Sequence, residues 1–192
     1  MSATLMPFGL KPIRHINGKF VPPPRQIPGG IASAYGTNIY FQDPVVMATT
    51  GVLQIGGATG DFYGVFAGCY YTASATALMT PSMSWPASQA YLADGSMYAA
   101  VWDDPGIIYE IACNGSLAQS SVGDQANLTN ITTGVNGLSV AEISSSLAGN
   151  GAQAQLRIVG LSQRPGNAWG DTYTVVEVMI AQQQYVSNKV AI

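Results

Sequence analysis

The chain has 192 residues, enough for one domain with a sizeable hydrophobic core. Only 9% of the residues are charged while 47% are hydrophobic, which excludes a disordered chain. No apolar run approaches the roughly 20 residues of a transmembrane helix, so a membrane-spanning helix is excluded as well. A chain with so little charge is expected to be secreted or packed against neighbours.

The few charges are unevenly distributed. Residues 1–25 carry a net charge of +4, residues 26–156 carry −8 without any Lys or Arg, and residues 157–192 carry +1. Residues 1–30 also contain six prolines and end in a Gly-Gly pair. Because proline fixes φ and removes a hydrogen-bond donor, we predict an extended basic arm (1–30) on a single β-rich body (31–192). The arm's ionisable side chains are Lys11, Arg14, His15, Lys19 and Arg25.

The segments after the arm have the character of short strands. Alternating or β-branched runs predict strands at 38–41, 45–48, 52–55, 61–73, 96–102, 107–112, 130–133, 154–161 and 172–181. Gly64 and Gly68 in the longest run are expected to form bulges or close backbone approaches. Residues 103–106 (Asp-Asp-Pro-Gly) predict a hairpin turn between two strands, and Asn136-Gly137 is typical of a tight turn.

Two other segments differ from this pattern. Residues 76–88 are expected to form an irregular loop because Pro81 and Pro86 lie within them. Residues 138–147 suggest a short helix, since Ser139 and Glu142 have the spacing of a capping box. The fold class predicted is mainly β, a β-sandwich or β-barrel body with an extended N-terminal arm and at most one short helix.

The start of the chain has no leading positive charge and Pro7 interrupts its apolar stretch, so we do not expect a secretory signal. The N-glycosylation sequons at Asn114, Asn127 and Asn130 are therefore expected to be unused. Cys69 and Cys113 are interpreted as buried thiols in a reducing compartment, with a disulfide as the alternative.

Catalytic and cofactor sites are not expected. His15 is the only histidine, and it lies in the arm, where it cannot be held beside a nucleophile. Two cysteines and one distant histidine do not suffice for a zinc site, and no lysine accompanies the glycine cluster at 56–60. Asp103 and Asp104 are adjacent in a turn, either as a solvated or Asx-turn pair or as an acidic contact for a neighbour's arginine.

Several segments resemble a family of tailed-bacteriophage capsid decoration (cement) proteins. They include PFGLKPIRHING at 7–18, ASAYGTNI at 32–39, VWDDP at 101–105 and LRIVGL at 156–161. The resemblance implies a β-rich body on the capsid exterior, with the N-terminal segment lying on the major capsid protein. It also implies a protein that is made in the host cytoplasm and carried on the virion.

We therefore predict a structural virion protein, not an enzyme, that stabilises the shell without a cofactor. Its partners are expected to be the major capsid protein and other copies of itself, as a dimer or trimer. Nucleic acid is not an expected partner, because four cations neutralise few phosphates and the acidic body repels the backbone. The contacts are expected to come from Lys11, Arg14, His15, Lys19, Arg25, Asp103 and Asp104.

Two alternatives remain open. One is another virion role, such as a head–tail connector, a tail component or a fibre anchor. The other is a carbohydrate-binding module that uses Trp85 or Trp169 on a β surface.

Overall fold

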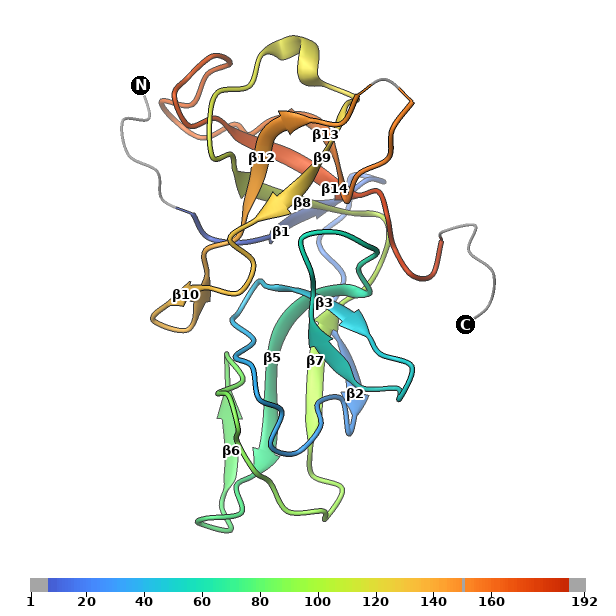
Figure 1. Cartoon of the computed structure of the whole chain (residues 1–192), viewed down its shortest axis with the longest axis vertical. Helices are drawn as coiled ribbons and strands as arrows, with labels where there is room; N and C mark the ends of the chain where they lie inside the picture. The colour runs from blue at the N-terminus through green and yellow to red at the C-terminus, as the bar shows by residue number, and fades with distance from the viewer. Residues whose placement is uncertain (1–6, 150, 187–192) are drawn as a thin grey trace.

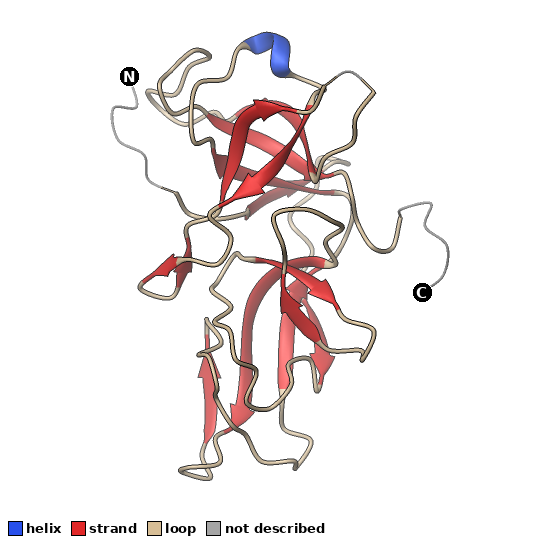
Figure 2. Cartoon of the chain, viewed as in Figure 1, coloured by secondary structure: helices blue, strands red, loops and turns tan. Residues whose placement is uncertain are grey.

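The computed structural model describes residues 7–149 and 151–186, which form two β lobes along the long axis of the molecule (Figure 1). Strands dominate the regular structure (Figure 2), and the single helical segment within those ranges is a 3-10 turn, Gln119–Ser121. The prediction of a mainly β body with at most one short helix is confirmed.

The upper lobe in Figure 1 is built on a six-stranded antiparallel sheet. Its strand order is β1 (Lys11–His15), β8 (Ile107–Ala112), β14 (Val175–Ile180), β13 (Leu156–Leu161), β9 (Gln125–Thr129) and β12 (Glu142–Leu147). The sheet curls until β12 meets the end of β8, where the Asn114 N–H donates to the Ile143 carbonyl at 3.1 Å. The upper core includes Tyr109, Ile111 and Val176.

The lower lobe contains the second six-stranded sheet. Its order is β2 (Arg25–Pro28), β7 (Tyr98–Trp102), β5 (Gly64–Thr72), β3 (Pro44–Met47) and β4 (Leu53–Ile55), and β6 (Met79–Ser82) pairs with the second half of β5. Its core includes Phe66 and Trp85. Phe62 and Val65 instead pack in the upper core, so apolar contacts join the two lobes.

A short hairpin, β10 (Gly134–Val135) and β11 (Leu138–Ser139), lies between the lobes (Figure 1). Phe41 of the lower lobe bonds to it through two backbone hydrogen bonds of 3.0 Å, to Gly137 and from Ser139. Asn136 and Gly137 both have positive φ, as the tight turn predicted for this Asn-Gly pair requires.

Residues 7–30 do not form a detached arm, which corrects the expectation drawn from the prolines. β1 pairs with β8 in the upper sheet, and β2 pairs with β7 in the lower sheet. Edge strands tolerate proline because one side of each strand makes no ladder hydrogen bonds. The segment is extended, but it packs on its own body and connects the two lobes. Residues 1–6 of the predicted arm lie outside the described residues.

The strands predicted at 96–102 and 107–112 exist, but they do not form a hairpin. β7 belongs to the lower sheet and β8 to the upper sheet, so residues 103–106 cross between the lobes. The Asp104 carboxylate accepts the Gly106 N–H at 2.7 Å, which makes the crossing an Asx turn.

The helix suggested at 138–147 is also wrong, since these residues form β11 and β12. The Ser139 hydroxyl accepts the Ala141 N–H at 3.1 Å, and the Glu142 carboxylate bonds to Asn130 instead of closing a capping box. Ile143 is buried in the upper core. Burial of its side chain and pairing with β9 therefore outweigh a weak local helix signal. The loop expected at 76–88 likewise contains β6.

Local patterns with a steric cause were predicted correctly. The register of β5 shifts between Phe66 and Gly68, and Gly68 has a φ of 119°. A Cβ on Gly64 would lie 2.8 Å from the Val101 side chain. In β14, Val176 and Val178 face the upper core while Glu177 and Met179 are less buried, as the alternation indicates.

Candidate partner-binding surfaces

Two cations of β1 are already paired on the outer face of the upper sheet. Lys11 Nζ lies 3.9 Å from the Glu110 carboxylate, and Arg14 forms an ion pair with Glu177. Arg164 holds Glu110 with two hydrogen bonds of 2.6 Å. Burial alone would raise the pKa of Glu110, but its hydrogen bonds and the nearby cations outweigh burial and hold the pKa below its usual value.

Four other predicted contact residues meet in pairs where the lobes join. His15 Nε2 lies 3.2 Å from Asp104 Oδ1, and Arg25 Nε donates to Asp103 Oδ2 at 2.6 Å. The structure thus brings Arg25 together with Asp103 and His15 together with Asp104, but within one chain. Among the described residues, Lys19 is the one predicted cation without an ion pair.

Arg25 and Asp103 belong to a larger cluster that includes the end of the described chain. The Arg25 guanidinium lies beside the rings of Tyr63 and Tyr185, 5.4 and 5.7 Å from their centroids, and donates to both hydroxyls. Gln183 is buried and donates to the Asp103 carbonyl at 2.6 Å. This cluster fastens the segment after β14, which comes from the upper lobe, onto the lower lobe. We call Arg25, Tyr63, Asp103 and Tyr185 the junction cluster.

The link between β1 and β2 exposes an apolar tip that sequence reasoning missed. Phe20 is 97% exposed and Ile16 is 59% exposed, with Lys19 beside them. The tip is ordered by hydrogen bonds: the His15 N–H donates to the Lys19 carbonyl at 3.0 Å, and the Asn17 side chain accepts the Lys19 N–H at 3.0 Å. Three prolines follow at 22–24 and restrict the backbone of the segment that leads from this tip to β2. We call residues 16–20 the Phe20 loop.

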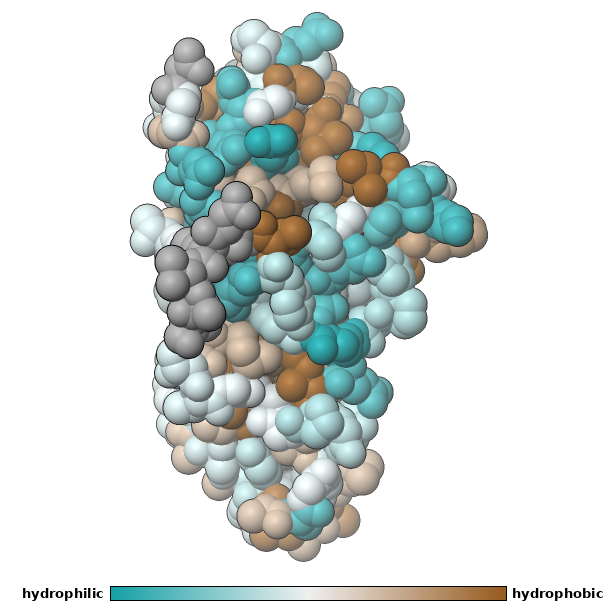
Figure 3. Space-filling model, turned by 90° about the vertical axis from the view of Figure 1, so that its right-hand side faces the viewer, coloured by the Kyte–Doolittle hydropathy of each residue, from teal (hydrophilic) through white to brown (hydrophobic). Residues whose placement is uncertain are grey.

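The lower lobe has very little charge. Between Gln26 and Trp102 the sequence contains three ionisable acids and no cation, and one of the acids, Asp43, is buried. The end of the lobe is mostly pale in Figure 3, where the strongly hydrophilic colour lies higher on the molecule. Exposed apolar side chains gather in this lobe instead: Leu78, Met79, Met83 and Leu92.

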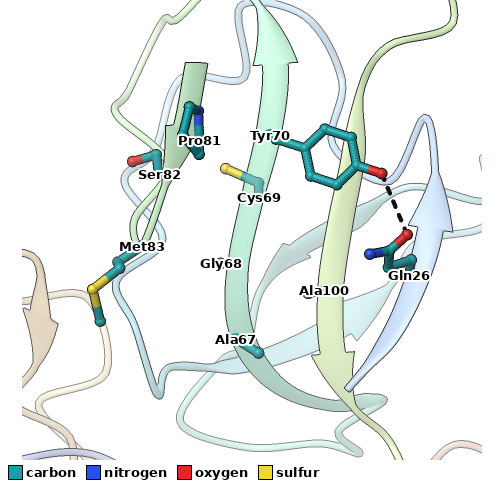
Figure 4. A pocket seen from close by; sticks show the side chains of 9 residues that line it. All are labelled: Gln26, Ala67, Gly68, Cys69, Tyr70, Pro81, Ser82, Met83 and Ala100. Carbon is teal, nitrogen blue, oxygen red and sulfur yellow. Dashed lines mark hydrogen bonds between the residues drawn. The ribbon is translucent and has the colours of Figure 1, made fainter. Parts of the chain in front are cut away.

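A shallow groove of about 300 Å³ lies on the outer face of the lower sheet (Figure 4). It runs across β7, β5 and β6, over the small residues Ala67, Gly68 and Ala100. Tyr70 borders the groove, stacked on Tyr98 with ring centroids 4.9 Å apart. The remaining lining residues are Gln26, Cys69, Pro81, Ser82 and Met83, so no charged side chain lines the groove.

A buried carboxylate lies beside the hairpin between the lobes. Asp43 Oδ2 accepts the Tyr40 N–H at 2.7 Å, while Oδ1 has no hydrogen-bond partner within the described ranges. Burial raises the pKa of Asp43 to about 7, against the smaller opposing effects of the Ser139 hydroxyl and the Tyr40 N–H. This group is expected to titrate near neutral pH.

The tryptophans do not form an exposed shelf. Trp85 is fully buried in the lower core and packs edge-on against Tyr71, with centroids 5.3 Å apart. Trp169 is half-buried against the upper core. The carbohydrate-binding alternative therefore loses Trp85 as a platform.

Cys69 and Cys113 are free thiols in the structure, as the sequence predicts. Within residues 7–149 and 151–186, no group of three or more His, Cys, Asp or Glu side chains is arranged to hold a metal ion. No helix in the same ranges is long and apolar enough to cross a membrane.

No family model, curated protein or solved structure matches this chain. The resemblance to decoration proteins therefore stays a prediction, and any functional assignment depends on the surfaces described above.

Proposed function

We propose that this chain is a structural virion protein that binds the outer surface of a bacteriophage capsid and stabilises the shell as a decoration protein. The observation that carries the proposal is the Phe20 loop, where a phenylalanine is 97% exposed on an ordered and proline-stiffened link. A large apolar side chain on a loop already held by hydrogen bonds loses little conformational freedom when a partner buries it, which suits a binding anchor. Its place in the N-terminal segment agrees with the contact that the family resemblance implies.

The contacts within the chain favour a different set of residues for this proposed contact. A clamp by Lys11, Arg14 or Arg25 would first have to break ion pairs within the chain, and one by His15 would have to break its contact with Asp104. Within the described part of the chain no carboxylate forms a competing ion pair with Lys19, which lies next to Phe20. We therefore assign the contact with the major capsid protein to Ile16, Lys19 and Phe20.

Stabilisation follows from mass action. A protein that binds the assembled shell but not its separated subunits shifts the equilibrium toward the shell. Many copies that each contact more than one neighbour would bind more tightly than a single contact allows. The charge-poor lower lobe supports this role, because it offers a second uncharged surface for neighbours.

The test is co-sedimentation of the purified protein with phage shells assembled without it. Phe20→Ala should weaken binding by about 10- to 100-fold, the loss of a buried phenylalanine at about 1.5–3 kcal/mol. Val135→Ala is the matched control, because Val135 is 61% exposed on the hairpin and should leave binding unchanged. Absence of wild-type binding would overturn the proposed function, whereas undiminished binding of Phe20→Ala would overturn only the assigned contact.

The other virion roles make a different prediction. A connector, tail component or fibre anchor would bind at one vertex or on the tail and leave the shell surface bare. If binding of this chain saturates at a few copies per shell, one of these other virion roles is favoured over decoration.

A further inference from the structure

We infer that the outer face of the lower sheet is the surface through which two copies of this chain pair. The face comprises the groove and the apolar residues beside it on the β6 side, Met79, Pro81 and Met83. This inference goes beyond the capsid role and does not depend on it.

The charge distribution favours a second copy as the occupant. In a twofold pair each patch meets the same patch of its partner, so a charged patch would meet like charge. The chain has a net charge of −3, yet no charged side chain lines the groove. This face can therefore meet itself without electrostatic repulsion, and a strongly charged partner would leave its own charges unpaired there.

The shape of the face is complementary to itself. The groove floor consists of the small residues Ala67, Gly68 and Ala100, and Met83 projects from its border, 58% exposed. Figure 4 shows Met83 directed away from the floor, on the β6 side. A hollow and a projecting side chain on one face satisfy the isologous requirement that each copy offers both. Methionine suits this role because its flexible side chain fills irregular hollows.

The pairing uses the faces of the sheets and not their edges. Pro81 lies opposite Tyr70 in the β5–β6 ladder and has no N–H to donate. Because proline is tolerated where its nitrogen faces away from the ladder, it removes a donor from the free edge of β6. A short strand with an outward proline resists addition of another strand. The side chains of the face are thus left to make the contact.

Sedimentation equilibrium of the full chain tests the inference. We expect a concentration-dependent dimer that persists between about 0.1 and about 1 M salt, because apolar contacts are not screened. Met83→Lys should raise the dimer dissociation constant at least about tenfold, since like charges would enter both grooves. Ala100→Met, which fills the groove from inside, should do the same. Val135→Lys introduces the same charge on the hairpin and should leave the dimer intact.

Circular dichroism and the melting temperature establish that the variants are folded. A wild-type chain that stays monomeric at all concentrations would overturn the inference, as would a dimer unaffected by both Met83→Lys and Ala100→Met. A monomer whose shell binding is lost in Met83→Lys would also overturn it, and would assign the face to the capsid. Failure of shell binding by a chain that dimerises as expected would contradict the proposed function alone.

Discussion

Arg25 and Asp103 join the two lobes: the guanidinium on β2 donates to the carboxylate on the crossing between β7 and β8 at 2.6 Å. Both residues were expected to contact a partner. In the structure they contact each other, and with Tyr63 and Tyr185 they form the junction cluster. Residues that appear in the sequence as a basic arm and an acidic loop therefore contribute to stability within one chain.

Removal of the arginine should destabilise the fold. In Arg25→Met, Asp103 loses its cation while its side chain remains only 16% exposed. We expect the free energy of unfolding to fall by about 1–3 kcal/mol, the range for a buried polar group that loses its hydrogen-bond partner. Chemical denaturation measures it, with Lys19→Met as the control that should change stability by less than about 0.5 kcal/mol. Equal effects of the two substitutions would contradict the role of the junction cluster.

Asp43 should make stability depend on pH near neutrality. Its pKa is about 7 in the folded chain and near 3.8 in the unfolded chain, so the folded state binds more protons between these values. Stability should therefore decrease as pH rises from about 4 to about 7 and level off above that, a total of up to about 4 kcal/mol from this group.

Asp43→Asn keeps an oxygen for the Tyr40 N–H but cannot ionise. We expect this variant to lose the decrease between pH 5 and pH 8.5, in melting temperatures recorded across that range. Parallel pH profiles for the wild type and the variant would show that Asp43 does not titrate as described.

Gly64 should not tolerate a side chain. A Cβ there would overlap the Trp102 carbonyl and lie 2.8 Å from Val101 Cγ1. Gly64→Ala should destabilise the chain by about 1–3 kcal/mol or prevent folding, because backbone cannot yield as a side chain can. Gly36→Ala is the matched control, since its Cβ would meet no atom within 4 Å. Soluble yield and denaturation midpoint distinguish the two variants, and a wild-type midpoint for Gly64→Ala would refute this reading.

The cysteines should be unreactive in the native state. Burial raises the pKa of Cys69 to about 12 and raises that of Cys113, so burial disfavours both thiolates. A thiol reagent should label neither residue in the native chain and both after denaturation. Rapid labelling of one native thiol would show that its surroundings open.

Much of the local structure follows from the sequence. Val176 and Val178 alternate with Glu177 in β14, and Asn136-Gly137 forms its turn, because each pattern reports a preference of neighbouring residues. The wrong predictions concern segments whose structure is determined by contacts with strands that are distant in the sequence. Ile143 enters a core built largely by other strands, and residues 103–106 cross between sheets that no local signal separates.

The candidate binding surfaces likewise combine features that the local sequence predicts with features that depend on distant contacts. Charge patterning drew attention to the cations of residues 1–25, but it cannot show that Glu110 and Glu177 lie beside Lys11 and Arg14. Phe20 precedes three prolines, and this local signal could have identified the exposed loop. The groove is not visible in the sequence, because its lining comes from four strands that meet only in the folded chain.

The central claim is that this chain decorates a capsid, and a density map of the virion tests it most directly. The account predicts many copies spread over the outside of the shell, each with its Phe20 loop against the major capsid protein. Density for this chain confined to one vertex or to the tail, or a virion that lacks the chain, would contradict it.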